Sequence, residues 1–112
     1  MYRELLEHAL EQNSGQLDFE AVVSGVEAGL YQAWLAPSSI AVTTIDEYPL
    51  SKICTVVLGA GNLSECRDVL LPKMEQFAKG HGCSRLMIVG RAGWEKALPG
   101  FKRTAVISEK VL

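Results

Sequence analysis

Hydrophobic residues recur at helical spacing in the first quarter of the chain. Over residues 2–12 leucines alternate with charged side chains, a pattern that predicts a short amphipathic helix. A second helix is predicted over 18–29, with Asp18 as its N-cap, because valines and other apolar residues follow at intervals of three and four. Gly25 costs helix stability, so its presence within this helix predicts that a neighbouring group packs closely there.

The pattern then changes to the period and residue types of strands. Residues 31–35 are a short candidate, residues 40–48 are rich in β-branched side chains, and residues 53–58 are almost continuously apolar. Pro49 separates the second from the third, and 36–39 is a turn. We therefore expect a meander of three strands, the third covered on both faces.

A glycine-rich connection leads from the third strand into a long helical segment. The connection is Gly59-Ala60-Gly61-Asn62, and the helix is predicted to begin at Asn62 and to run to Lys79. Asn62 with Glu65 three residues later is a variant of the capping box. Pro72 falls inside the helix and must kink it or divide it.

The last quarter predicts three short elements: a buried strand at 86–89, a short helix at 91–98 and a final strand at 101–111. The expected order is α-α-β-β-β-α-β-α-β, which is a mixed α/β (α+β) sheet with helices packed on it. We expect one domain over residues 1–112, with 1–15 as an N-terminal helical extension.

Composition narrows the functional classes. The 112 residues are 48% hydrophobic, enough for a core, and the net charge of −2 argues against a general nucleic-acid or acidic-membrane surface. The N-terminus lacks the apolar region of a signal peptide, and the longest apolar runs are too short to cross a bilayer.

Cys54 and Cys83 lie in apolar runs and are expected to be buried and reduced. His8 and His81 have no metal-ligand spacing, so we expect no metal.

Five segments of the second half resemble the GNAT acetyltransferases: ICTVVLGAG, the helix to Lys79, SRLMIVG, GWEKAL and Gly100-Phe101. The resemblance covers residues 53–112 and implies a GNAT-like fold with a mixed, mostly antiparallel sheet. Residues 82–101 are also similar to small proteins of bacteriophage and prophage origin. That likeness implies a phage protein, located in the host cytoplasm or the virion.

Two functional hallmarks of GNAT enzymes are missing from the matching positions. The connection after the central strand has no basic residue beside it, and Arg67 comes a turn or more into the helix. Trp94 stands nearest the place where many of these enzymes have a tyrosine acid, and an indole cannot supply that proton. The glycines are therefore either a plain tight turn or a minimal phosphate site. If acetyl-CoA binds, the resemblance implies contacts at Leu58, Gly59, Gly61 and Asn62.

The remaining candidates are contact residues. Trp34 and Trp94 are core anchors or, where exposed, interface anchors. Arg91 and Arg103 belong to a group of basic residues that form either a binding face or scattered solvated charges. Asp46-Glu47 could act as a base beside a cleft, but a solvated strand end is the simpler interpretation.

Two functions follow from these patterns. The first is a non-catalytic GNAT-like phage protein that works without a cofactor, through contacts with other protein subunits in an oligomer or a phage assembly. The alternative is an acetyl-CoA-dependent N-acetyltransferase with a minimal cofactor site. A small regulatory module of the host cell is a third possibility.

Overall fold

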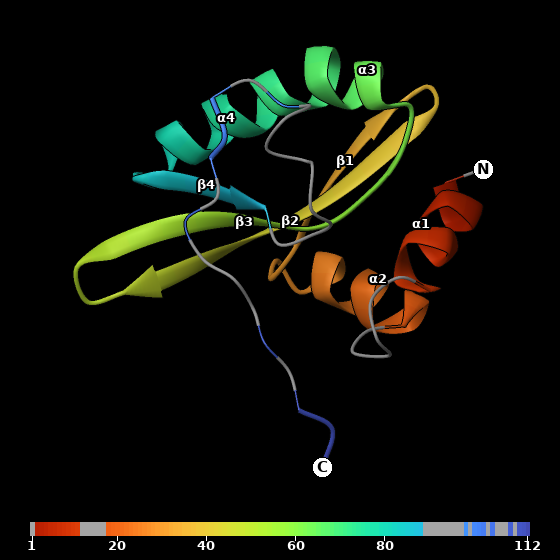
Figure 1. Cartoon of the computed structure of the whole chain (residues 1–112), viewed down its shortest axis with the longest axis horizontal. Helices are drawn as coiled ribbons and strands as arrows, with labels where there is room; N and C mark the ends of the chain where they lie inside the picture. Colours follow the sequence, from red (N-terminus) through yellow and green to blue (C-terminus); the bar gives the residue numbers. More distant parts are fainter. Residues whose placement is uncertain are drawn as a thin grey trace.

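The described part of the chain forms a four-stranded sheet with helices on both faces (Figure 1). The computed structural model describes residues 2–11, 18–88, 98, 100–102, 104, 108 and 110–112. The elements in these residues are, in order, α1 (Tyr2–Glu11), α2 (Phe19–Glu27), β1 (Gln32–Ala36), β2 (Ser39–Tyr48), β3 (Ser51–Gly61), α3 (Leu63–Glu65), a π-helical turn η1 (Cys66–Leu70), α4 (Leu71–Gly80) and β4 (Arg85–Ile88).

The strands lie in the order β1-β2-β3-β4. The first two pairs are antiparallel and β3 pairs with β4 in parallel, through a connection that contains the helices α3, η1 and α4. The predicted mixed α/β fold with a mostly antiparallel sheet is confirmed.

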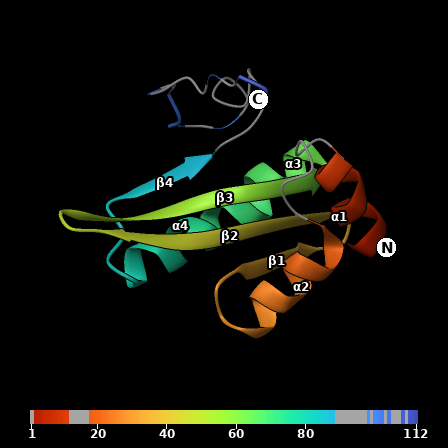
Figure 2. The same ribbon diagram turned by 90° about the horizontal axis from the view of Figure 1, so that it is seen from below.

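Helices cover both faces of the sheet (Figure 2), and each face carries its own hydrophobic core. On one face α1 and α2 pack through Leu6, Leu10 and Val22 against strand residues that include Val42 and Leu58. On the other face η1 and α4 pack on the sheet; the buried members of that cluster are Ala36, Ala41, Val56, Leu70, Leu71, Met74 and Leu98. The covered middle of β3 explains its continuous apolar sequence.

The predicted boundaries of α2 follow from its caps. The carboxylate of Asp18 accepts a hydrogen bond from the backbone N–H of Ala21 at 2.7 Å, so Asp18 is the N-cap as predicted. The helix ends at Glu27, and Gly29 takes a positive φ of 79° directly after it. The close packing expected at Gly25 is also confirmed, because the ring of Tyr31 occupies the space of a Cβ there.

Pro72 divides the long helical segment, as predicted. Proline cannot donate a backbone hydrogen bond, and its ring clashes with the carbonyl one turn earlier. The chain widens into the π-helical turn η1, where the N–H of Leu71 donates to the carbonyl of Cys66. Pro72 then occupies the first turn of α4, the one part of a helix that tolerates it.

Strand β3 is longer than the sequence predicts. It runs through Gly61, with Gly59 paired to Ala41 and Gly61 paired to Ser39, so the glycines belong to the strand and not to a separate turn. Glycine weakens a strand, but here it allows the backbone to approach a neighbouring turn closely. Strand β1 also begins one residue later than expected, at Gln32.

The end of the chain is described only in part. The predicted helix at 91–98 lies outside the described residues apart from Leu98, which is buried in the second core. Within the predicted strand 101–111, the described residues Phe101, Lys102 and Thr104 have no strand structure, so a final strand is not confirmed. In the described part of the chain, no helix is long and apolar enough to cross a membrane.

Candidate functional site

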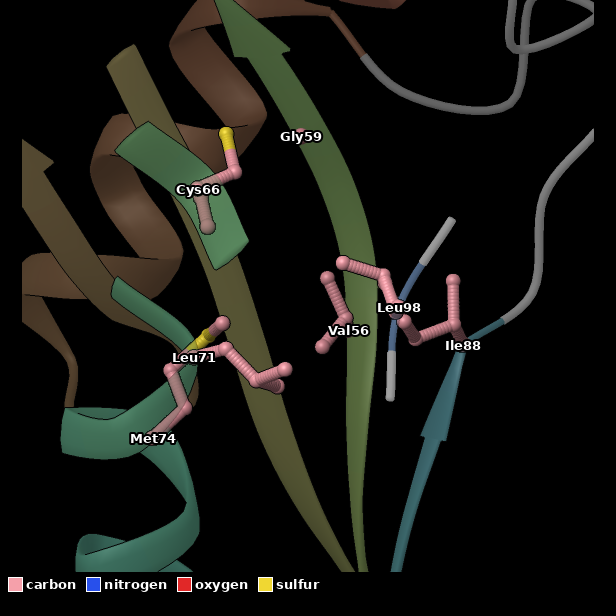
Figure 3. A pocket seen from close by; sticks show the side chains of 8 residues that line it. Val56, Gly59, Cys66, Leu71, Met74, Ile88 and Leu98 are labelled. Atoms are coloured by element: carbon pink, nitrogen blue, oxygen red, sulfur yellow. The ribbon is translucent and has the colours of Figure 1, made fainter. Parts of the chain in front are cut away.

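An apolar cavity lies where the parallel pairing of β3 and β4 ends, at Val56 and Ile88 (Figure 3). Its lining comes from both strands, from β2, from the helical layer and from Leu98 after β4: Ala41, Val56, Gly59, Cys66, Leu71, Met74, Ile88 and Leu98. The cavity volume is about 20 Å³, which is room for about one water molecule. Its walls are carbon and sulfur, so it suits a small apolar group and offers a charged ligand nothing to bind.

A β-bulge in β3 sets which side chains face this cavity. Val42 pairs with Leu58 and Thr43 pairs with Val56, so Val57 is an extra residue in the ladder. Val57 and Leu58 consequently both pack toward α1 and α2, and Gly59 returns to the cavity side. Leu58, a predicted cofactor contact, therefore has its side chain in the core under α1.

The start of the α3 helix is filled by groups of the chain itself. Asn62 is the N-cap, and its side-chain oxygen accepts from the backbone N–H of Glu65 at 3.0 Å, as the sequence predicts. The carboxylate of Glu65 does not return to Asn62, as it would in a full capping box. It accepts instead from the backbone N–H of Ser38 at 2.8 Å, which ties the β1–β2 turn to the helix.

Ser39 completes this junction, and sequence patterns did not single it out. Its buried hydroxyl accepts from the backbone N–H of Asn62 at 3.0 Å and lies 3.3 Å from the carbonyl of the same residue. Gly61 has a φ of 114°, and a Cβ on it would overlap the backbone of Ser38 and Ser39. The glycine is thus required by the close approach of two chain segments. A serine two residues after a turn proline is too common a pattern to predict such a contact.

Arg67 is the basic residue nearest to this junction in the helical segment, and it is already paired. Its guanidinium forms two bonds to the carboxylate of Asp68, at 2.8 and 3.1 Å. This pairing raises the pKa of Arg67 and lowers the pKa of Asp68. Because both side chains are exposed, the pair contributes little to stability.

The cavity also lacks an acid or a base among the residues that line it. Cys66 carries its one ionisable group, and burial raises the pKa of that thiol, with a smaller lowering from a hydrogen bond with Ser39. A protonated thiol is a poor nucleophile at neutral pH. Asp46, the candidate base, lies at the far end of β2, where its carboxylate accepts from the Thr55 hydroxyl at 3.2 Å.

The described residues of this junction meet the requirements of acetyl-CoA only in part. Its pyrophosphate requires unpaired N–H donors and a cation, whereas the N–H groups of Asn62 and Glu65 are bonded within the chain and a carboxylate lies beside them. The cavity next to Gly59 has no room for an acetyl-pantetheine chain.

The predicted contact residues have different outcomes. Trp34 is half-buried: its indole N–H donates to the Thr43 hydroxyl at 2.8 Å, and its ring meets Phe77 edge-on with centroids 5.2 Å apart. The hydrogen bond joins β1 to β2 and the ring contact joins β1 to α4, in agreement with the core alternative for this tryptophan. Trp94, Arg91 and Arg103 lie outside the described residues, so their roles stay predictions.

Similarity to known proteins is confined to the fold. No family model and no curated protein sequence matches the chain. A point mutant of TTHA1254 from Thermus thermophilus shares 16% identity at a TM-score of 0.68, over 98% of this chain and 90% of that one. A transcriptional regulator from Bacillus halodurans shares 15% at a TM-score of 0.60, over 99% and 91%. A glucosamine-6-phosphate N-acetyltransferase from Arabidopsis thaliana shares 15% at a TM-score of 0.49, over 66% and 56%. At these identities the comparisons give a fold and no activity.

Proposed function

We propose that this chain is a non-catalytic protein on an acetyltransferase-type fold and that it acts through contacts with other protein subunits. The observation that carries the proposal is the junction of β3 and α3. The place where a GNAT enzyme would cradle pyrophosphate is used here for internal bonds of Ser38, Ser39, Asn62 and Glu65. A fold that retains its layers but fills its ligand site with its own groups is suited to a structural or binding role.

We further propose that the contacts are made in a bacteriophage particle or during its assembly. The support is the likeness of residues 82–101 to small phage and prophage proteins. A chain of 112 residues presented in many copies on a symmetric particle can rely on weak individual interfaces, because multivalency adds them together.

Quantitative mass spectrometry of purified particles tests this role. We expect the chain in particles released by the strain that carries its gene, at a constant ratio to the major capsid protein after density-gradient purification. A matched preparation from a strain deleted for the gene controls for carry-over from lysed cells. Absence of the chain from gradient-purified particles would remove the virion assignment.

One observation favours the alternative, an acetyl-CoA-dependent N-acetyltransferase. The bulge at Val57 and the end of the parallel pairing leave an apolar cavity beside Gly59, where the acetyl group of a cofactor could enter after local opening. This function requires the cofactor to bind, and the contact function does not. Binding of acetyl-CoA therefore separates the two.

A further inference from the structure

The hairpin between β2 and β3 projects beyond the rest of the sheet. β1 pairs with β2 no further than Thr43, and the ladder between β3 and β4 begins at Ile53. Residues 46–52 are therefore a two-stranded ribbon, and both overall views show its turn at one end of the molecule (Figures 1 and 2). A two-stranded ribbon without further packing is only marginally stable, so stability does not explain why this hairpin extends beyond the sheet.

The tip of this ribbon is apolar and exposed. Leu50 has 99% of its surface exposed and Tyr48 has 56%, with Pro49 between them. Single exposed apolar residues are common, but here two stand together on a convex tip held by the pairs Tyr48–Ser51 and Glu47–Lys52. Proline fixes its own φ, so the tip loses little conformational freedom when it is bound.

The flank that precedes the tip is acidic. The Glu47 side chain is 72% exposed, and Asp46 precedes it. The ammonium group of Lys52 lies 3.5 Å from the Glu47 carboxylate and also donates to the carbonyl of His81 at 3.1 Å, which directs it toward the end of α4. The ribbon thus presents apolar side chains with negative charge behind them.

We propose that this hairpin tip, Tyr48-Pro49-Leu50, inserts into an apolar pocket with a basic rim on a partner protein. The proposal rests on the contact function above and names the surface that makes the contact. A convex apolar anchor requires a concave apolar site, and the exposed carboxylate of Glu47 is complementary to arginine or lysine around it.

Two other occupants fit the ribbon less well. Membrane-surface segments are usually basic, and an acidic ribbon is repelled by anionic lipid. A second copy of this chain would have to receive Leu50, and the apolar cavity beside Gly59 is too small for a leucine side chain. The crosslinking test below distinguishes a membrane surface and a second copy of the chain from a partner protein.

Site-specific photo-crosslinking in the cells that make the protein tests the proposal. Tyr48 is replaced by p-benzoylphenylalanine in the full chain, which keeps an aromatic ring beside Leu50. The control carries the same residue in place of Leu63, which is 47% exposed on α3. Irradiation is expected to give one discrete adduct from position 48, mapped by mass spectrometry to apolar residues with arginine or lysine nearby.

The Leu50→Ser change is expected to lower the adduct yield at least tenfold, because burial of a leucine side chain contributes about tenfold or more to an affinity. Since Leu50 is exposed, this variant should melt like the parent, which circular dichroism checks. Adducts from position 63 but none from position 48 would overturn the proposal that the hairpin tip makes the contact. The proposed contact function itself would not be contradicted by that result. An adduct with lipid, or with twice the mass of the chain, would overturn the partner assignment. No adduct at either position would count against both proposals.

Discussion

Replacing Gly61 with alanine is expected to destabilise the protein by about 3 kcal/mol and to lower its melting temperature by about 10–20 °C. The φ of 114° is strained for any residue with a Cβ, and the new methyl group would lie 2.6 Å from the Cα of Ser39 and overlap the Ser38 carbonyl. Both obstacles are backbone, so the strand itself must move. That movement breaks the bond from Asn62 to the buried Ser39 hydroxyl.

The matched control is Gly29→Ala. Gly29 also has a positive φ, 79°, but no atom lies within 4 Å of an added Cβ. This variant should lose about 1–2 kcal/mol, the cost of left-handed backbone alone. Chemical denaturation of both variants, read by tryptophan fluorescence, gives the comparison. Equal losses in the two variants would mean that the approach of β3 to the β1–β2 turn is not a tight one.

Leu70→Ala should have an effect of similar or greater size, about 2–5 kcal/mol. Leu70 is fully buried and lies in the core of the helical layer, next to Leu71 and Met74. It belongs to the π-helical turn η1, whose geometry is fixed by Pro72 on its C-terminal side. Because this backbone cannot slide to close a cavity, we expect a loss toward the upper part of the range.

Leu50→Ala controls for the chemical change itself. It removes the same atoms from a side chain that is 99% exposed, so its effect on stability should stay within about 0.5 kcal/mol. Urea unfolding curves for the two variants and the parent provide the measurement. A loss below about 1 kcal/mol for Leu70→Ala would contradict the packing of η1 against the sheet.

Local sequence signals predicted the helices and most of the sheet. Asp18, Asn62 and Pro72 act through the backbone within a few residues of themselves, so their effects can be read from sequence. The extension of β3 through Gly61 could not be read in this way. It depends on hydrogen bonds to β2 and on contact with Ser38–Ser39, which are distant in sequence.

The candidate site was predicted less well for the same reason. Two glycines before a helix suit a phosphate cradle and a close chain crossing equally, and the choice depends on what lies opposite them. In this chain the opposite groups are the Ser39 hydroxyl, which follows the β1–β2 turn, and the Glu65 carboxylate, which is bonded to Ser38 in that turn. Neither Ser39 nor the bulge at Val57 has a sequence signature, because each arises from strand pairing.

A titration of ¹⁵N-labelled protein with acetyl-CoA, followed by amide NMR signals, tests the central claim most directly. The ligand is raised to about 1 mM, the upper end of usual Michaelis constants, and the signals of Gly59, Gly61, Leu63 and Glu65 are followed. If the junction of β3 and α3 is filled by the chain's own bonds, these signals will stay in place. Saturable shifts confined to these amides would contradict the account and would favour the alternative function, an acetyl-CoA-dependent N-acetyltransferase.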